Sequence, residues 1–128
     1  MEKIEKFLVD SDIIIDFLRG FQNSRDFLLG LKNKGTFFIS VVSIVEIYSV
    51  KDIANSTKKQ AVEDFFVAFE TIVLDRELAK QAGAMRLKYQ IPFADAIIAA
   101  TAVSFGLTLI TRNKKHFTGI DGLLIQSP

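Results

Sequence analysis

The sequence predicts an α/β fold built around a parallel sheet. Short apolar runs typical of buried strands recur along the chain, and longer stretches with apolar residues at helical spacing separate them. Strands that alternate with helices are typical of parallel sheets, because each helix carries the chain back to the edge where the next strand begins. We expect one domain over residues 1–128, since this length and the 49% apolar and 24% charged residues are ordinary for a globular domain.

The predicted strands are apolar runs of three or four residues that end at polar or turn-forming residues. Such runs are too short for a helix, and their β-branched and aromatic residues favour strands. They cover residues 7–9, 36–39, 71–74, 107–110 and 123–126.

The predicted helices begin after capping residues and end at a glycine or a break in the apolar spacing. Gly20 and Gly106 suit the left-handed conformation that often ends a helix. The candidate caps are Ser11 or Asp12, Asn23, Ser40 or Ser43, and Asp75. The helices are expected at about residues 12–19, 24–31, 41–52, 58–69, 76–89 and 92–105, with a short turn or helix at 114–117.

The composition excludes several function classes. The absence of Cys excludes disulfides, a thiolate nucleophile and a thiolate zinc site, and a single histidine excludes a multi-His metal site. The net charge of +1 provides no global attraction to nucleic acid or membrane. No long apolar run suggests a signal peptide or a membrane span, so we expect a cytoplasmic protein that does not act at a membrane.

Two carboxylates stand in unusually apolar surroundings. Glu46 is the only charged residue between positions 35 and 50, and Asp95 is the only one between 89 and 111. An ionised carboxylate in an apolar environment is costly unless it is paired or binds a metal. Each also has an ordinary explanation, because Asp95 could be an acid of the first helical turn and Glu46 a surface residue of an amphipathic helix.

The expected topology brings further polar residues to these carboxylates. Asp10 ends the first strand, and Thr111 and Asn113 follow the fourth. Because strand ends and helix starts lie at the same edge of a parallel sheet, Asp10, Asp95, Thr111 and Asn113 are expected to share one rim. Glu46 has to reach this rim from the third helix.

Other acids near this rim have simpler explanations. Asp12 is expected to cap the first helix, Asp16 to lie on its exposed face, and Asp75 to cap the fifth helix. Asp10 itself could be a turn acid.

Carboxylates gathered on one rim indicate a cation. They repel one another, and their pKa values rise unless a positive charge lies among them. Because the available ligands are hard oxygens, Mg²⁺ or Mn²⁺ is favoured over zinc or copper. Such an ion activates a water and stabilises a leaving oxygen, so phosphodiester hydrolysis is the natural reaction class.

Four motifs occur in a fixed order along the chain. They are LVDSD at 8–12, ISVVSIVE at 39–46, FADAIIAATA at 93–102 and LITRN at 109–113, the last followed by His116 and Phe117. In this order and spacing they resemble the PIN-domain ribonucleases, above all the VapC-type toxins of prokaryotic toxin–antitoxin pairs. The resemblance covers essentially the whole chain.

This resemblance implies a three-layer α/β/α fold with a central, mainly parallel sheet of about five strands. It also implies cleavage of RNA that depends on Mg²⁺ or Mn²⁺, a homodimer, and a small antitoxin protein whose tail blocks the groove. Asp10, Glu46 and Asp95 match the catalytic acids of the family, with Asp10 and Asp95 as direct metal ligands and Glu46 beside them.

The resemblance assigns supporting roles to other positions. Thr111 matches a hydroxyl near the site, and Ser11 and Asp12 are candidates for support. Asn113 is counted with the catalytic positions because some members carry a fourth acid there. An amide is a weaker and neutral ligand, so the resemblance leaves open whether one metal binds or two.

A basic cluster lies beside the expected rim. It consists of Arg112, Lys114, Lys115 and His116, and Arg19 at the end of the first helix is a further candidate. These residues could neutralise RNA phosphates. The alternative is a solvated loop, with His116 in a structural contact.

Three other functions remain open at this level. The chain could be a non-cleaving PIN-like module that binds RNA or protein, with Asn113 as its specific support. It could also be a housekeeping PIN nuclease that processes RNA. A phosphate-transfer or receiver-type domain is disfavoured because no glycine-rich phosphate loop appears.

Overall fold

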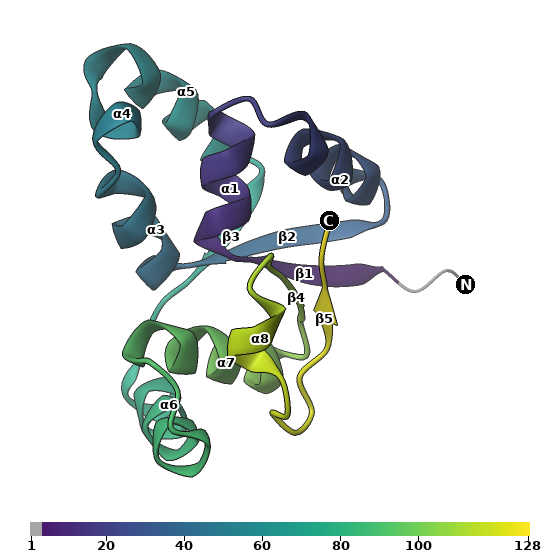
Figure 1. Cartoon of the computed structure of the whole chain (residues 1–128), viewed down its shortest axis with the longest axis vertical. Coiled ribbons are helices and arrows are strands. Elements are labelled where there is room, and N and C mark those ends of the chain that lie inside the picture. Colours follow the sequence, from purple (N-terminus) through teal and green to yellow (C-terminus); the bar gives the residue numbers. More distant parts are fainter. Residues whose placement is uncertain (1–3) are drawn as a thin grey trace.

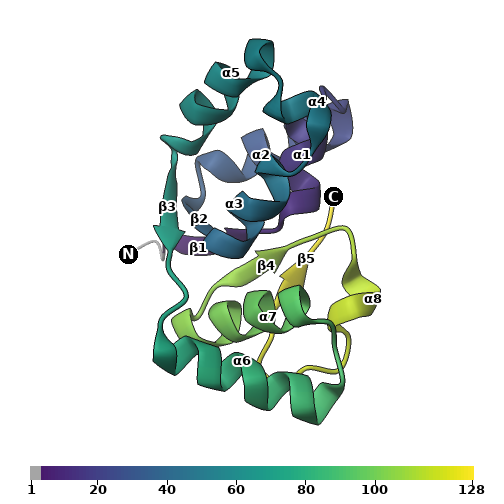
Figure 2. The same ribbon diagram turned by 90° about the vertical axis from the view of Figure 1, so that its left-hand side faces the viewer.

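The chain folds into a parallel sheet covered by helices on both faces. The structure is a computed structural model that describes residues 4–128, without the side chains of Ser56 and Lys58. Figures 1 and 2 show helices α1 to α5 on one side of the sheet and α6 to α8 on the other. This arrangement confirms the predicted three-layer fold. The predicted domain bounds of 1–128 stay a prediction, and residues 1–3 lie outside the described part.

All five strands run parallel, in the order β3-β2-β1-β4-β5. The central strand β1 pairs with β2 and β4, so the first strand of the sequence lies in the middle of the sheet. Their bounds are β1 Glu5–Val9, β2 Gly35–Ser40, β3 Phe69–Ile72, β4 Thr108–Ile110 and β5 Ile125–Gln126.

The third strand begins two residues earlier than predicted. Phe69 pairs with Phe37 of β2, and their ring centroids lie 5.3 Å apart. This aromatic cross-strand pair places the register over residues 69–72. Val73 and Leu74, which the sequence pattern assigned to the strand, lie beyond it in the connection to the next helix.

The eight helices of the described chain follow the predicted order, with one break. The predicted third helix is divided: α3 ends at Tyr48, and a separate turn, α4, follows. Ser49 ends α3 by directing its hydroxyl to the Val45 carbonyl, which competes with continued helix. The bounds are α1 Ser11–Leu18, α2 Gln22–Lys32, α3 Val41–Tyr48, α4 Lys51–Ala54, α5 Ser56–Phe66, α6 Arg76–Tyr89, α7 Phe93–Phe105 and α8 Lys114–Phe117.

The helix caps decide where the site residues stand. Asp75 caps α6 and Ser40 caps α3, as predicted. The prediction for α1 is wrong, because Asp10 is its N-cap and accepts a hydrogen bond from the Ser11 N–H. Asp12 lies inside the first turn of α1. The prediction of Asn23 as a cap is also wrong, since α2 begins one residue before it, at Gln22, without a side-chain cap.

Two apolar layers fill the space on either side of the sheet. Along β1, Phe7 and Val9 contribute to the layer under α1, α2, α3 and α5, and Leu8 contributes to the layer under α7 and α8. All three are fully buried. Because residues 7–9 of β1 are covered on both faces, this part of the strand is a continuous apolar run rather than an alternating one. No helix among residues 4–128 is long and apolar enough to cross a membrane.

Candidate active site

The site is built where β1 and β4 end side by side. Val9 is paired with Ile110, so the residues that follow them, Asp10 and Thr111, become neighbours. The Asp10 N–H donates to the Ile110 carbonyl at 2.9 Å, and the Thr111 hydroxyl donates to Asp10 Oδ2 at 2.9 Å. The predicted rim at the carboxyl ends of the strands therefore contains both residues.

Asp10 is held in one orientation and lies in a costly environment. Its Oδ1 accepts a hydrogen bond from the Ser11 N–H at 2.9 Å, while Oδ2 accepts from Thr111. The side chain is almost covered, with 8% of the residue exposed. Burial, then the nearby Asp12 carboxylate, raises the pKa of Asp10 to about 7 despite these hydrogen bonds.

Glu46 reaches the rim from α3. The Ser11 hydroxyl donates to Glu46 Oε1 at 3.2 Å and so joins the start of α1 to the middle of α3. Burial raises the pKa of Glu46, and the Asp95 and Asp12 carboxylates raise it further. Glu46 is therefore an exposed residue of an amphipathic helix, as one of the two expectations had it, and its carboxylate is at the same time tied to Ser11 and lies near other acids.

Asp95 enters from the other side of the sheet. It is the third residue of α7, where an acid also suits the helix dipole. Its Oδ2 lies 3.1 Å from Nδ1 of His116 on α8. Acids from the end of β1, from α3 and from α7 therefore converge on one rim, although they come from distant parts of the chain.

The first helix supplies two more acids, one of which the sequence pattern misplaced. Asp16, expected on the exposed face of α1, is buried, with 4% of the residue exposed. The correction has a physical reason: Arg112 Nε lies 2.9 Å from Asp16 Oδ2 and provides the opposite charge. Asp12 Oδ2 accepts the Arg112 N–H at 3.1 Å, and burial raises the pKa of Asp12.

The predicted RNA-binding residues separate into three groups. Lys114, Lys115 and His116 lie exposed on α8, beside the rim. Arg112 is engaged by Asp16. Arg19 lies at the far end of α1 from Asp10 and pairs with Asp52, so the structure does not bring it to the site.

Asn113 meets the site through its backbone. Its N–H donates to the Thr111 hydroxyl at 3.1 Å, and its side chain is at the exposed start of α8. The loop from Thr111 to Asn113 thus borders the rim, next to the end of β1 and the start of α1. The sequence pattern singled out Thr111 and Asn113 but gave no signal for the contact between Arg112 and Asp16, because these two residues are almost a hundred positions apart.

The donor set fits a hard divalent cation. Asp10, Glu46 and Asp95 offer carboxylate oxygens, the ligands that Mg²⁺ and Mn²⁺ prefer. Burial raises the pKa values of Asp10 and Glu46, and neighbouring carboxylates raise them further, so a cation at the rim would offset the cost of ionising them. Within residues 4–128, no three Asp, Glu, His or Cys side chains are already gathered tightly enough to hold a metal ion together.

Comparison with known proteins identifies the relatives of this chain. The family model described as PIN domain matches residues 7–123. Ribonuclease VapC10 of Mycobacterium tuberculosis is 35% identical over 115 residues, which cover 86% of this chain and 84% of that protein. Ribonuclease VapC1 of Methanocaldococcus jannaschii is 32% identical over 123 residues, covering 91% of this chain and 83% of that protein.

Solved structures share the fold. A toxin–antitoxin complex from Klebsiella pneumoniae contains a chain that is 30% identical, with a TM-score of 0.80 over 91% of this chain and 94% of that chain. A chain of VapBC2 from Rickettsia felis, bound to a promoter DNA fragment, also has a TM-score of 0.80, over 96% and 98% of the two chains. At 22% identity, this second likeness concerns the fold alone.

Proposed function

The chain belongs to the PIN-domain family, and from this membership we propose that it is a metal-dependent endoribonuclease that cleaves RNA phosphodiesters. The observation that carries the proposal is the convergence of Asp10, Glu46 and Asp95 on one rim, with raised pKa values for the first two. Two similar proteins named as ribonucleases, at 35% and 32% identity over most of the chain, support the same reaction.

Mg²⁺ or Mn²⁺ is the proposed cofactor, held by Asp10 and Asp95 with Glu46 beside them. The chemistry supplied by such a cation is the activation of a water and the stabilisation of the leaving 3′ oxygen. Asp10 depends on it most, since a carboxylate with a pKa of about 7 is only partly ionised at neutral pH.

The surrounding residues orient these acids. Thr111 and the Ser11 N–H fix one oxygen each of Asp10, so this carboxylate cannot rotate without losing a hydrogen bond. The Ser11 hydroxyl fixes Glu46 in the same way. Preorganised groups of this kind lower the reorganisation needed during the reaction.

The exposed cations of α8 are proposed to hold the RNA backbone. Lys114 and Lys115 lie on the same short helix as His116, which contacts Asp95. Their charges would neutralise phosphates on either side of the scissile bond, with an affinity that falls as salt rises. Such contacts carry no base specificity by themselves.

We further propose that the protein is the toxin of a type II toxin–antitoxin pair. The support is the 30% identical chain from Klebsiella pneumoniae, which was solved as a toxin–antitoxin complex. A small antitoxin partner, a homodimer and a cytoplasmic location are parts of this proposal. Expression of the chain alone should arrest growth, and co-expression of a short open reading frame next to its gene should restore it. Growth that is unaffected by the chain would favour a housekeeping RNA-processing nuclease.

A non-cleaving RNA- or protein-binding module is the second candidate. It is favoured by Asn113, which offers a neutral amide, and by the loose spacing of the carboxylates among the described residues. In that case the rim would bind Mn²⁺ weakly or not at all.

The test compares the wild-type chain with Asp10→Asn and Asp95→Asn. Each variant keeps the side-chain volume but removes a proposed ligand, so RNA cleavage with Mn²⁺ should fall by about 100-fold or more. Thermal unfolding should show no loss of fold. Asp121→Asn is the control, because Asp121 is an exposed acid paired with Lys88 away from the rim. Cleavage at the wild-type rate by either site variant would reject the proposal.

A further inference from the structure

The loop that leaves β4 is fastened to α1 through Arg112. The Arg112 N–H donates to Asp12 Oδ2 at 3.1 Å, and Nε of the same residue lies 2.9 Å from Asp16 Oδ2. Asp12 and Asp16 are one turn apart on the same face of α1. The backbone of Arg112 therefore binds the first acid and its side chain binds the second. Arg112 is therefore the point at which the loop is attached to the helix that Asp10 caps.

The attachment fixes the residue before Arg112. The Thr111 hydroxyl accepts the Asn113 N–H at 3.1 Å and donates to Asp10 at 2.9 Å. A hydroxyl has one proton to donate. When one of its two partners is itself a donor, the hydroxyl accepts from that partner and donates its proton to the other. The Thr111 proton therefore points at Asp10 only while the loop keeps residues 111–113 in this arrangement.

The burial of Asp16 shows that the ion pair is more than a surface contact. The Asp16 side chain is only 6% exposed, whereas the side chain of Arg112 is 53% exposed. A buried carboxylate without a counter-charge is costly. Moving the guanidinium away would therefore leave the Asp16 carboxylate buried and unpaired, which favours the position of Arg112 seen here. The exposed Arg19–Asp52 pair, at the other end of α1, lacks this constraint.

We propose that Arg112 and Asp16 are positioning residues for the carboxylate rim: their ion pair holds the loop so that Thr111 orients Asp10. This inference rests on the proposed ribonuclease function. It assigns Arg112 a different role from the expected contact with RNA phosphate, because the guanidinium lies against Asp16 on the protein.

The two roles of Arg112 predict opposite effects for Asp16→Asn. If Arg112 positions the loop, loss of the Asp16 charge releases the loop and lowers kcat. If Arg112 binds RNA, loss of that charge frees the guanidinium and lowers KM for RNA. Asp16 is buried and negatively charged, so it is not itself a ligand for RNA phosphate.

The experiment measures RNA cleavage by the full chain and Mn²⁺ binding by calorimetry. We expect Arg112→Ala and Asp16→Asn each to lower kcat and Mn²⁺ affinity by about 10- to 100-fold, as for other residues that orient metal ligands. KM for RNA should stay within about twofold. The double variant should be no worse than Arg112→Ala, because that substitution already removes the contact with Asp16, together with a longer 3.9 Å contact between Arg112 Nε and Asp12 Oδ2. Asp52→Asn, which breaks the other Arg–Asp pair of α1, is the matched control and should leave both readouts unchanged.

A rescue experiment separates positioning from general destabilisation. Guanidinium ion at a low, non-denaturing concentration should restore part of kcat to Arg112→Ala, because the site beside Asp16 can accept it. It should have no such effect on Asp16→Asn. Where Arg112→Ala unfolds below the assay temperature, Arg112→Lys provides the same comparison, since it keeps the charge but loses the planar donor geometry.

Three results would overturn the inference. They are a lower KM in Asp16→Asn, kcat and Mn²⁺ affinity within twofold of wild type in both variants, or additive losses in the double variant. A wild-type chain that binds Mn²⁺ but leaves RNA intact would count against the ribonuclease function alone, because the Mn²⁺ measurement still tests the ion pair.

Discussion

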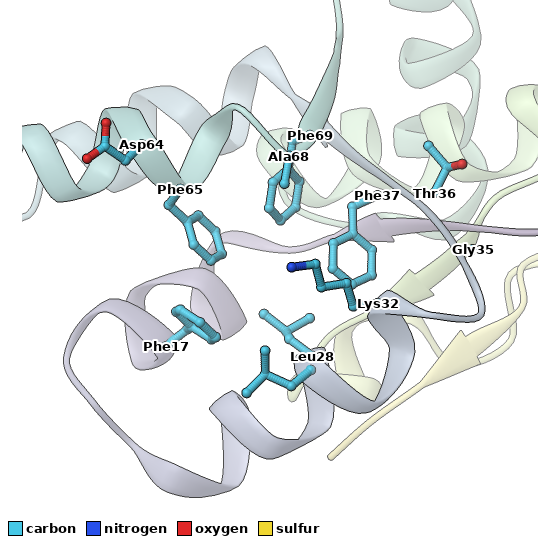
Figure 3. A pocket seen from close by; sticks show the side chains of 11 residues that line it. Phe17, Leu28, Lys32, Gly35, Thr36, Phe37, Asp64, Phe65, Ala68 and Phe69 are labelled. Carbon is cyan, nitrogen blue, oxygen red and sulfur yellow. The ribbon is translucent and has the colours of Figure 1, made fainter.

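The carboxylate rim and the phenylalanine groove on the same side of the sheet as α1 are opposites in chemistry. The groove is an apolar hollow of about 480 Å³ between α1, α2, β2 and α5 (Figure 3). Phe65 lies between Phe17 and Phe69, with ring centroids 4.7 and 5.1 Å away, and Phe69 continues to Phe37. At the rim, by contrast, burial raises the pKa values of Asp10 and Glu46, and the Asp12 carboxylate raises both further.

The difference shows where the fold gains stability and where it gives stability up. Aromatic burial and ring contacts in the groove favour the folded state. Gathered carboxylates in the rim disfavour it until a cation is present. The apolar packing of the groove therefore helps to offset the free energy lost by gathering acids at the rim. The predictions below alter one region and examine the other, beginning with the largest effect.

Removal of divalent metal should affect the rim alone. We expect EDTA to reduce RNA cleavage by about 100-fold or more, because the acids would lose the proposed cation, which favours the ionised form of Asp10. Added Mg²⁺ or Mn²⁺ should restore cleavage, and the circular dichroism of the chain should stay the same throughout. Cleavage that survives thorough chelation would contradict the metal-dependent mechanism.

Truncation of a groove aromatic should affect stability and leave the chemistry of the rim intact. Phe37 is 9% exposed and contacts both Phe7 and Phe69. Phe37→Ala should lower the free energy of unfolding by about 3–5 kcal/mol, as measured by urea denaturation. The matched control is Phe105→Ala, at the exposed end of α7, with an expected loss below about 1 kcal/mol. A change in kcat per folded molecule of Phe37→Ala would show that the two regions are coupled.

The stability of the metal-free chain should depend on pH, because ionisation of Asp10 at the rim is unfavourable in the folded state. The pKa of Asp10 rises from 3.8 to about 7 on folding, so between these values the folded state binds more protons than the unfolded state. Stability should then fall as pH rises from about 4 to about 7, by on the order of 1–4 kcal/mol, and level off above.

Urea denaturation in EDTA at pH 5 and pH 8 measures this effect. Asp10→Asn removes the titrating group and should reduce the loss between the two values, while Asp121→Asn, far from the rim, should keep it. A wild-type chain that is more stable at pH 8 than at pH 5 would show that Asp10 is not destabilised by its surroundings.

Local patterns were enough to single out the acids of the proposed site. Glu46 and Asp95 stood out because each is the only charged residue of an apolar stretch, and Asp10 stood out because it ends a predicted strand. Burial of such a carboxylate requires a partner wherever the chain folds. The alternation of strands and helices also implied that Asp10 and Thr111 follow parallel strands. These inferences depend on neighbours in sequence, which is why they hold before any long-range contact is known.

Errors occurred where a partner lies far away in sequence. Asp16 looks like an exposed helical acid until Arg112, almost a hundred residues later, packs on α1. Arg19, predicted to contact phosphate, pairs with Asp52 at the far end of α1, and its RNA contact stays a prediction. Amphipathic spacing ranks faces of a helix by hydrophobicity, and it cannot show that a distant cation will cover one acid and leave another in water.

The sequence by itself determined the parallel α/β class, the order of strands and helices, and the two acids, Glu46 and Asp95, that interrupt apolar stretches, because backbone propensity and the cost of burying charge are local properties. Only the tertiary structure decided that Asp10 caps α1, that α3 stops at Tyr48, and that Arg112 is directed to Asp16. These features depend on contacts between segments whose relative position is fixed by strand order and core packing, and no spacing along the chain encodes them.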